Sequence, residues 1–462
     1  MSSELCFASA RALAGSIASG ALRATELMEA TLRQAERVEP QINALAHRAF
    51  DAARRSAEDA DGASAAGAPV GPLHGLPITV KDGIAISGLP NTSGSKACRD
   101  VIASSDDIVW ARLRNAGAIL IAKTTTPEFF SKVLTDSAAF GVTTNPWSPM
   151  HSPGGSSGGA AAALAVGVGV LAVGSDGGGS LRCPASCTNT VAIKPTLGRI
   201  PNSGVPDTFA NFASIGPMAR RIDDLELLYG VMTGSDRDDA QSLGASPMAR
   251  RHTNAPVRRI GWLEGTHLDA FDPDLVRLTR EATFALAGRN TDIVRLDGDF
   301  LDKVFDIYSV ISCTGHAARW AGLPEAVRHD VTPAFLDIVR QGLGYSAVDF
   351  KCASNDRTSL FRRIQKIFDD VGILAMPALS APAQRIDAGG AINSRLFAAW
   401  ARNLYPFNLT GHPALVVPCG FSPDGLPVGL QLVGRWHEEA ALFSVGRSIE
   451  AAACLTERHP CL

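Results

Sequence analysis

Apolar residues follow two different periods along this chain, and segments of the two kinds alternate. Short continuous apolar runs, such as 118–122 and 170–174, are typical of strands covered on both faces of a sheet. Segments with apolar residues three and four positions apart, such as 107–115 and 273–287, predict amphipathic helices. The alternation continues through residues 158–296, and it predicts an α/β fold with a largely covered sheet.

The pattern changes towards both ends of the chain. Residues 20–55 predict a helix that Pro40 closes, and the stretch 57–72, rich in Ala, Gly and Asp, predicts a surface connection. From about 300 to 370 several helices follow without obvious strands between them, which makes this region the candidate lid or pocket wall. Strands return over 373–377, 414–418 and 428–433, with a hairpin turn at 422–425.

We predict a single domain over residues 1–462, because no fixed repeat is present and no segment after residue 72 has the composition of a linker. The expected architecture is α/β, with a central mixed, twisted β-sheet covered by helices on both faces. The expected regions are an N-terminal helical arm (1–65), a core with the candidate chemistry (66–235), a variable helical pocket region (300–370) and C-terminal strands with a helix that complete the sheet (371–462).

Composition and charge exclude several classes of protein. A hydrophobic content of 46% with 19% charged residues is that of an ordinary folded protein. A net charge of -3 gives no electrostatic basis for nucleic acid or an anionic membrane as partner. Glu4 precedes the first basic residue, and the longest apolar run, 160–173, is broken by Gly167 and Gly169, so neither a secretory signal nor a membrane span is expected. We therefore expect a cytoplasmic protein.

The cysteines point to packing and not to a metal site. Nine cysteines scattered over a long chain are typical of reduced thiols. Cys183 and Cys187 are four positions apart, but no second Cys/His pair with zinc spacing accompanies them. We expect no metal and no cofactor.

One lysine stands out, because only 8 of the 43 basic residues are lysine. Lys81 follows the apolar run 78–80 and precedes the turn signal Asp82-Gly83, so it is predicted at the carboxyl end of a buried strand. That edge of an α/β sheet is where sites are built. Buried lysine can lose its proton, whereas arginine effectively cannot, so Lys81 is a candidate base.

Two glycine-flanked serine clusters lie within residues 145–196, separated by an apolar segment long enough for a helix and a strand. The first, GGSSGG at 154–159, has three interpretations. A flexible linker is disfavoured because a helical apolar pattern follows at once, and a Gly-x-Ser-x-Gly nucleophile elbow needs a strand where two prolines stand. In the third interpretation the cluster is half of a site completed by DGGGS at 176–180.

Three glycines before Ser180 allow consecutive backbone N–H groups to face one point. Such a nest binds a phosphate or stabilises an oxyanion, and the glycine and lysine spacing of phosphate loops is not present in register. An oxyanion site needs a nucleophile, which Ser180 supplies, and a base. His412 and His437 are candidates without a distinctive setting, whereas Lys81 meets the requirement if it is buried.

Motifs spread over nearly the whole chain resemble those of the amidase signature family. The matching segments are 71–82, 154–159, 176–182, 194–201, 214–220, 406–414 and 425–434. The resemblance implies an amidohydrolase that cleaves a carboxylic acid amide through an acyl-enzyme and a Ser-cisSer-Lys triad. It assigns Ser180 as the nucleophile, Lys81 as the base and Ser156 as the bridging serine on a cis peptide bond.

The resemblance also implies supporting roles around the triad. Ser157 is expected to hydrogen-bond within the same network. Asp176 and Arg182 are expected to form a buried pair that holds the loop, the alternative being a solvent-exposed pair. The backbone donors expected to face the oxyanion are the N–H groups of Gly177, Gly178, Gly179 and Ser180.

Two details depart from the commoner family pattern. Gly177 stands where threonine or isoleucine is more frequent, so we expect a more mobile nucleophile loop. Residues 192–193 read Ala-Ile where Gly-Leu is more usual, a packing change without a functional interpretation.

The acyl pocket is expected to be apolar or aryl, with release of ammonia or an amine. The residues behind this hypothesis are Phe209, Phe212, Tyr308, Trp320 and Phe335, although aromatic residues at helical spacing are more often core.

The partner is expected to be a small-molecule amide, with a homodimer as a further hypothesis. Alternatives are a urea-derivative hydrolase of the biuret or allophanate kind and a partner-dependent amidotransferase or glutaminase subunit. The latter is disfavoured because residues 205–213 do not read like a Ser-Ser-Leu-Asp-Gln loop. A vestigial, non-enzymatic subunit is disfavoured because Lys81, Ser156 and Ser180 are all retained.

Overall fold

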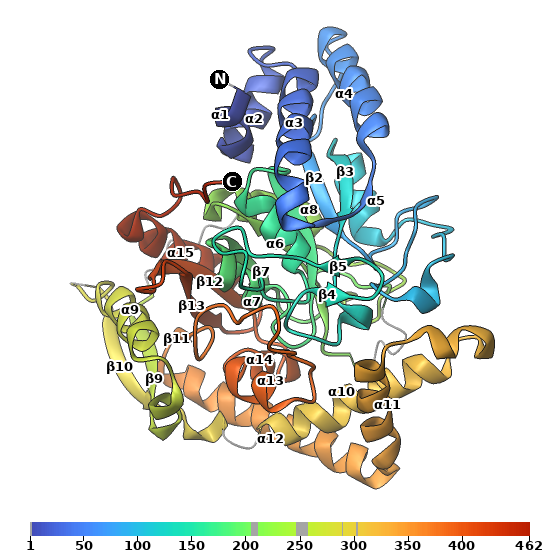
Figure 1. The fold of residues 1–462 in the computed structure, drawn as a ribbon. Helices are drawn as coiled ribbons and strands as arrows, with labels where there is room; N and C mark the ends of the chain where they lie inside the picture. Colours follow the sequence, from blue (N-terminus) through green and yellow to red (C-terminus); the bar gives the residue numbers. More distant parts are fainter. Residues whose placement is uncertain (1, 205–210, 246–256, 289, 302–303) are drawn as a thin grey trace.

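A computed structural model describes residues 2–204, 211–245, 257–288, 290–301 and 304–462, and it places helices around one large β-sheet (Figure 1). In the described chain the sheet has eleven strands in the order β1-β3-β2-β6-β8-β7-β12-β13-β11-β9-β10. The strands are β1 (Leu45–Arg48), β2 (Pro77–Lys81), β3 (Ile119–Thr124), β6 (Leu171–Asp176), β7 (Val191–Lys194), β8 (Ser214–Ala219), β9 (Arg259–Glu264), β10 (Asp292–Asp297), β11 (Ile373–Pro377), β12 (Ala414–Phe421) and β13 (Pro427–Gly434).

The sheet is mixed, as predicted. β2 runs parallel to β3 and β6, and β9 runs parallel to β10 and β11, whereas the pairs formed by β8, β12 and β13 are antiparallel. A separate two-stranded ribbon joins β4 (Asp136–Ser137) and β5 (Gly141–Val142). The single α/β domain is confirmed, while the bounds of the four regions stay a prediction.

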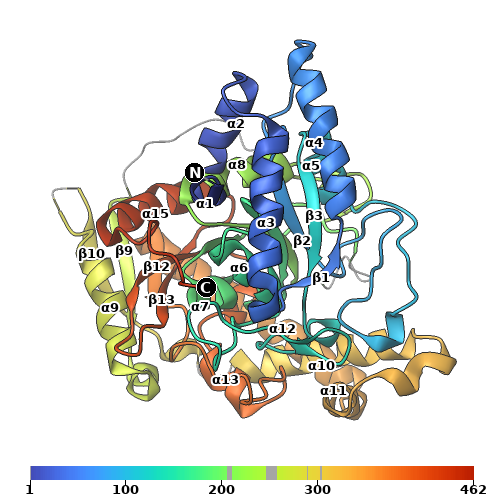
Figure 2. The same cartoon turned by 45° about the horizontal axis from the view of Figure 1, so that its top comes forward.

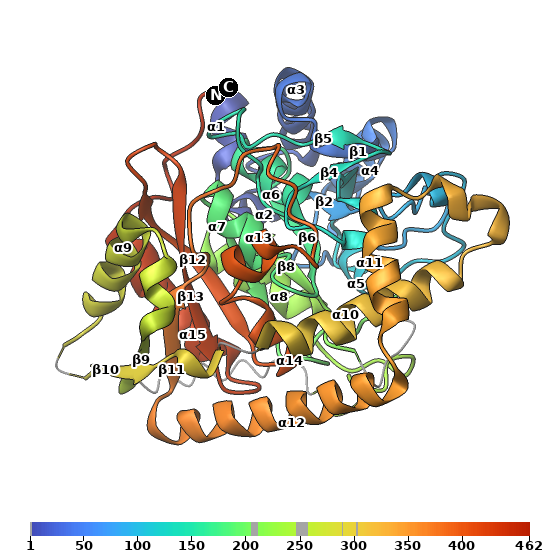
Figure 3. The ribbon, with the colours of Figure 1, turned by 60° about the horizontal axis from the view of Figure 1, so that its bottom comes forward.

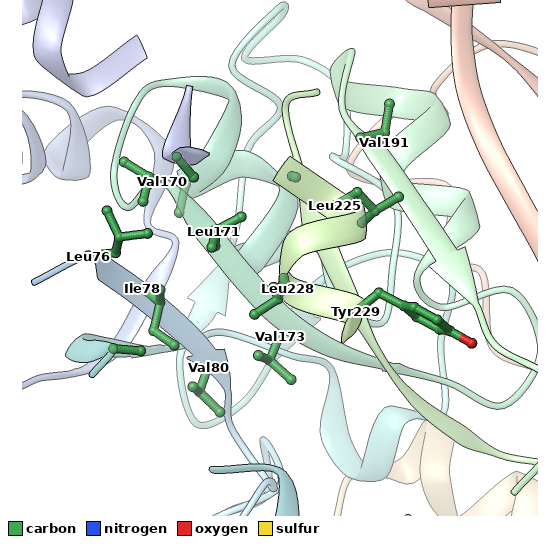
Figure 4. Packing of buried hydrophobic residues seen from close by; sticks show 14 of the residues in the cluster. Leu76, Ile78, Val80, Val170, Leu171, Val173, Val191, Leu225, Leu228 and Tyr229 are labelled. Carbon is green, nitrogen blue, oxygen red and sulfur yellow. The ribbon is translucent and has the colours of Figure 1, made fainter. Parts of the chain in front are cut away.

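Helices cover both faces of this sheet. Alternate residues of one strand enter two different cores: in β11, Ile373 and Ala375 belong to a first core cluster, and Leu374 and Met376 to a second. Figure 4 shows part of the first core cluster, where residues of β2 such as Ile78 lie beside residues of β6 and α8 (Ile222–Met232). A sheet buried on both faces explains why its strands read as continuous apolar runs.

The described part of the chain forms fifteen α-helices. They are α1 (Ser2–Phe7), α2 (Ala10–Ala18), α3 (Ala24–Ile42), α4 (Phe50–Ala65), α5 (Ile108–Asn115), α6 (Gly158–Ala165), α7 (Arg182–Thr188), α8 (Ile222–Met232), α9 (Pro273–Phe284), α10 (Val304–Ala321), α11 (Pro333–Gly344), α12 (Ala347–Asp370), α13 (Arg395–Trp400), α14 (Tyr405–Leu409) and α15 (Glu439–Ala453). Short 3-10 helices are η1 (Lys96–Cys98), η2 (Glu128–Phe130), η3 (Thr266–Ala270), η4 (Asp299–Leu301) and η5 (Glu325–Asp330). No described helix is long and apolar enough to cross a membrane.

The single helix predicted over residues 20–55 is wrong. α3 ends at Asn43, which adopts the left-handed conformation with φ 48°, and β1 follows and pairs antiparallel with β3. The sequence pattern concealed this break because β1 has only four residues. Pro40 lies inside α3 and does not close it.

The surface connection predicted over residues 57–72 is wrong in its first half, which belongs to α4. Ala53, Ala57 and Ala60 form a buried small-residue stripe at helical spacing, and α4 packs beside α3 (Figure 2). Asp61 of α4 accepts hydrogen bonds from the backbone N–H of Ala24 at 2.6 Å and from the Thr25 hydroxyl at 2.6 Å. The composition indicated a linker, but the alanines supply a packing face.

The helical region predicted from about 300 to 370 is confirmed. α10, α11 and α12 pack on one another, and Figure 3 shows α12 running along one end of the molecule. α10 also contacts α14, which connects this region to the C-terminal part of the chain.

The first prediction concerns the core. Replacing Leu432 of β13, which is fully buried, with alanine is expected to lower the free energy of unfolding by about 2 to 5 kcal/mol, because a cavity replaces packed atoms. The matched control is Leu343→Ala, at a side chain that is 63% exposed, with an expected change within about 0.5 kcal/mol. Urea denaturation of both variants measures the difference, and equal losses would contradict the assigned burial.

Candidate active site

The sheet topology brings Lys81 to the candidate nucleophile loop. Lys81 is the last residue of β2, and the neighbouring parallel strand β6 ends at Asp176. Val80 pairs with Val173, so the two strands end at the same edge of the sheet. The loop from Gly177 to Ser180 follows directly and leads into α7. The strand-end position predicted for Lys81 is confirmed.

The other serine cluster reaches the same point from the start of α6. The peptide bond between Gly155 and Ser156 is cis, and Ser157 is the residue just before α6. The Ser157 N–H donates to the Ser180 carbonyl oxygen at 3.1 Å, which ties the two clusters together. The Thr126 hydroxyl donates to the Ser156 carbonyl oxygen at 2.8 Å and holds the turn against the end of β3. Among the described residues, no strand runs directly into 154–158, so the nucleophile-elbow interpretation does not fit the fold.

Lys81 is fully buried among serine hydroxyls. Its Nζ donates to the Oγ atoms of Ser156 at 2.7 Å, Ser157 at 3.0 Å and Ser175 at 3.0 Å. It also lies 4.7 Å from the centroid of the Phe130 ring. Burial lowers the Lys81 pKa to about 7, although the negative charges of Asp176 and Asp82 act to raise it.

Both of these carboxylates are bound to other cations. Asp82 forms a buried ion pair with Lys123 at 3.2 Å and accepts a hydrogen bond from the Thr92 hydroxyl at 2.6 Å. Asp176 forms a buried ion pair with Arg182, with Nε to Oδ2 at 2.9 Å. Because each carboxylate has its own cation, neither compensates the Lys81 charge directly, and desolvation dominates its titration.

The predicted pair of Asp176 and Arg182 is confirmed as buried. Arg182 binds both oxygens of Asp176 and also donates to Gln431 Oε1 at 2.7 Å, Asn408 Oδ1 at 2.6 Å and the Leu404 carbonyl oxygen at 2.9 Å. The guanidinium holds the pKa of Asp176 well below its usual range. The pair therefore connects the nucleophile loop to α14 and β13.

The nucleophile loop wraps around the same carboxylate. The Gly179 N–H donates to Asp176 Oδ1 at 2.7 Å, and Gly179 has φ 114°, a conformation that favours glycine. Within the described chain, the N–H groups of Gly177, Gly178 and Ser180 make no hydrogen bond, so they are the loop donors that can face an incoming oxygen.

Ser180 lies at the cavity and is 8% exposed. In the described residues no hydrogen bond joins the hydroxyls of Ser180 and Ser156, although both line the same cavity. The structure thus brings Lys81 into contact with Ser156 and places Ser180 beside them.

A cavity of about 780 Å³ opens onto these serines. Its lining is largely apolar and aromatic, and it comprises Phe129, Phe130, Lys132, Val133, Ser156, Ser175, Gly177, Gly178, Ser180, Asn211, Phe212, Ala213, Tyr308, Ile311, Ser312, Thr314, Gly315, His316, Ala318, Arg319, Gly322, Leu323, Phe350, Ile392 and Phe397. The volume and composition are those of a small-molecule site.

The five predicted pocket aromatics divide into three groups. Phe212 and Tyr308 line the cavity, and their rings are 5.9 Å apart. Trp320 and Phe335 are not in its lining and pack in a third core cluster, so their assignment to the pocket is wrong. Phe209 lies outside the described residues. Side-chain type alone does not distinguish residues of the cavity wall from residues of the core, because both sets are apolar.

The cavity residues that the sequence does not predict include Phe129, Phe130, His316 and Arg319. The adjacent phenylalanine pair was the available signal, and both residues have positive φ, at 48° and 64°. The two α10 residues gave no signal, because their approach to the site depends on how α10 packs.

Neither histidine considered as a base lies in the cavity lining. His412 is buried between Phe368 and Trp436, and burial lowers its pKa to about 3. His437 is exposed just before α15. Among the described residues, no group of three or more His, Cys, Asp or Glu is placed to hold a metal, and Cys183 and Cys187 lie buried in the second core cluster.

Comparisons with known proteins agree with this arrangement. A family model described as Amidase matches residues 26–443. The chain is 32% identical to an acylamidase of Rhodococcus erythropolis over 99% of this chain and 98% of the relative. It is 33% identical to a glutamyl-tRNA(Gln) amidotransferase subunit of Chloroflexus aggregans over 99% of both chains.

Solved structures give the same result. A 6-aminohexanoate cyclic dimer hydrolase superposes with a TM-score of 0.89 at 29% identity, covering 98% of this chain and 99% of the other. A bacterial aryl acylamidase superposes with a TM-score of 0.90 at 26% identity over the same shares. The chain belongs to the amidase signature family, and it is an amidohydrolase of that family.

The second prediction uses two adjacent loop glycines. A Cβ at Gly178 would lie 2.4 Å from the Tyr308 hydroxyl oxygen, whereas at Gly177 it would make an ordinary 3.6 Å contact with Ala213. Gly178→Ala is expected to displace the loop and lower kcat/KM for an amide by about 10- to 100-fold. Gly177→Ala is the matched control, with expected kcat/KM close to that of the parent. Similar values for the two variants would show that the loop is not packed as described.

Proposed function

We propose that this protein hydrolyses carboxylic acid amides, with Ser180 as nucleophile, Lys81 as base and Ser156 as the relay between them. The observation that carries the proposal is the 2.7 Å contact of the buried Lys81 Nζ with Ser156 Oγ, at a lysine whose pKa lies at about 7. A lysine with so low a pKa is neutral in part of the molecules near neutral pH, as general-base catalysis requires.

Acylation begins when the neutral Lys81 amine accepts the Ser156 proton and Ser156 accepts the Ser180 proton. Ser180 Oγ then bonds to the amide carbonyl carbon, and the carbonyl electron pair moves onto oxygen. The N–H groups of Gly177, Gly178 and Ser180 stabilise this oxyanion, each such donor being worth about 3 kcal/mol. Gly179 supports the loop through its bond to Asp176.

Collapse of the tetrahedral intermediate breaks the C–N bond. The Lys81 ammonium returns its proton through Ser156 to the leaving nitrogen, which departs as ammonia or an amine. Water then attacks the Ser180 ester with the same two groups as base and relay, and the acid is released. Ser157 and Ser175 hold Nζ in place, at 3.0 Å each, and need not change protonation.

The lining of the cavity and the names of two similar proteins support one substrate class. Phe212, Tyr308 and Phe397 give the wall an aromatic, apolar character, which favours an aryl or apolar acyl group. The acylamidase and aryl acylamidase relatives support this choice.

The amidotransferase alternative rests on the similarity to the Chloroflexus aggregans protein. It requires glutamine as substrate and further partner proteins. Turnover of a simple amide by the isolated chain, with glutamine left intact, decides against this alternative and against a vestigial, non-enzymatic protein.

The third prediction concerns Lys81. Because only the neutral amine accepts a proton, kcat/KM is expected to rise with pH through a midpoint close to 7, the pKa of Lys81. Lys81→Ala is expected to lower kcat/KM by about 10²- to 10⁴-fold above pH 7 and to abolish this titration. The matched control is Lys351→Ala, at an exposed residue of α12. A Lys81→Ala variant of parental activity, measured by ammonia release, would refute the assigned base.

The fourth prediction separates the two serines. A fluorophosphonate probe is expected to label Ser180 and not Ser156, because Ser180 is the attacking group. Mass spectrometry of peptides from the parent and from Ser180→Ala identifies the modified residue. A label on the Ser156 peptide would restore the elbow interpretation, and the absence of any label together with no turnover of an amide panel would remove the hydrolase proposal.

A further inference from the structure

A cationic side chain that pairs with no carboxylate of the described residues faces the candidate site from α10. Arg319 lines the cavity, and its guanidinium carbon lies 5.4 Å from the Phe129 ring centroid and 5.7 Å from that of Phe130. Across the described residues, no carboxylate forms an ion pair with it. These two cation–π contacts hold the guanidinium beside the rings and use none of its N–H donors.

The other basic residues of the cavity do not compete for an anion. Lys132 is paired with Asp136 at 2.6 Å. Burial, helped by the charge of Arg319, lowers the pKa of His316 to about 3, so its imidazole is neutral at pH 7. The described lining contains neither aspartate nor glutamate. Among the described residues, Arg319 therefore brings to this largely apolar cavity a positive charge that no carboxylate pairs with.

The nearest acidic residue along the neighbouring segment is already bound elsewhere. Glu128, next to Phe129, accepts hydrogen bonds from the Ser95 hydroxyl at 2.7 Å, from the Thr332 N–H at 2.9 Å and from the Thr332 hydroxyl. Both carboxylate oxygens are thus occupied. Among the described residues, Glu128 makes these bonds and forms no ion pair with Arg319.

The guanidinium and the proposed base share one aromatic neighbour. The Phe130 ring centroid is 4.7 Å from Lys81 Nζ and 5.7 Å from the guanidinium carbon of Arg319. Ile311 of α10 and Phe397 of α13, which line the same cavity as the serines and Arg319, are apolar. One small molecule can therefore present an amide to Ser180 and an anionic end to Arg319.

We infer that Arg319 binds a carboxylate of the substrate, so that the preferred amides carry a free carboxylate separated from the scissile amide by a short apolar spacer. The planar guanidinium matches a carboxylate with two parallel hydrogen bonds. This inference rests on the proposed amide hydrolysis and names its substrate class.

Two pairs of matched substrates test the inference with the full chain. One pair is the mono-4-nitroanilide of adipic acid and its methyl ester, and the other is 4-acetamidobenzoate and 4-acetamidobenzamide. The parent is expected to favour the carboxylate of at least one pair by about 10- to 100-fold in kcat/KM, mostly through a lower KM. The ratio within each pair is the readout, because it cancels a general loss of activity.

Arg319→Gln is expected to reduce that ratio to about 1, and Arg319→Lys to an intermediate value because an ammonium binds as a point charge. Arg340→Gln is the control, since Arg340 is 70% exposed and pairs with Asp337 on the surface of α11. A ratio near 1 for the parent in both pairs, or a ratio that Arg319→Gln leaves unchanged, overturns the inference. If Arg319→Gln does not fold, the inference is tested by the ratio of kcat/KM for the carboxylate and neutral substrates in Arg319→Lys.

A binding measurement separates this inference from the proposed function. Calorimetry with adipate needs no turnover, and the parent is expected to bind it about 10-fold or more tightly than Arg319→Gln does. If no amide is hydrolysed but adipate binds in this way, the hydrolase proposal fails and the anion site stands. If amides are hydrolysed while adipate binds the parent no more tightly than the variant, the anion site fails alone.

Discussion

The buried ion pair of Asp176 and Arg182 is the interaction on which the rest of the site depends. It joins the carboxyl end of β6 to the start of α7, and Arg182 extends it to Gln431 of β13 and Asn408 of α14. Because breaking a buried pair leaves an uncompensated charge, the geometry is strongly held. The loop that presents Ser180 is therefore positioned by residues more than two hundred positions away.

The sheet topology explains why chain segments so far apart can cooperate. Adjacent parallel strands, β2 and β6, end at one edge of the sheet and deliver Lys81 and the nucleophile loop together. α6 starts at the same place and adds two serines to the lysine. A mixed sheet with both faces covered provides a rigid base for this arrangement, since neither strand end can move without disturbing two cores.

The sequence predicts much of this fold, but the failures have definite physical causes. The continuous apolar run at residues 373–377 predicts strand β11 at its observed bounds. Strand β8 escaped the pattern because Gly216 and Pro217 interrupt it, and α4 because its buried face consists of alanine. The proposed catalytic groups were found through motifs, whereas Arg319 could not be, because its place in the cavity depends on the packing of α10.

Burial of Lys81 has a consequence for folding as well as for chemistry. A shift of its pKa from 10.5 to about 7 means that folding at neutral pH works against protonation of this side chain, at a cost of several kcal/mol. Between about pH 7 and 10 the unfolded chain holds more protons here than the folded chain does, so this contribution to stability improves as pH rises. Catalytic activity and folding stability thus both depend on the protonation of Lys81, and both are higher on the alkaline side of neutrality.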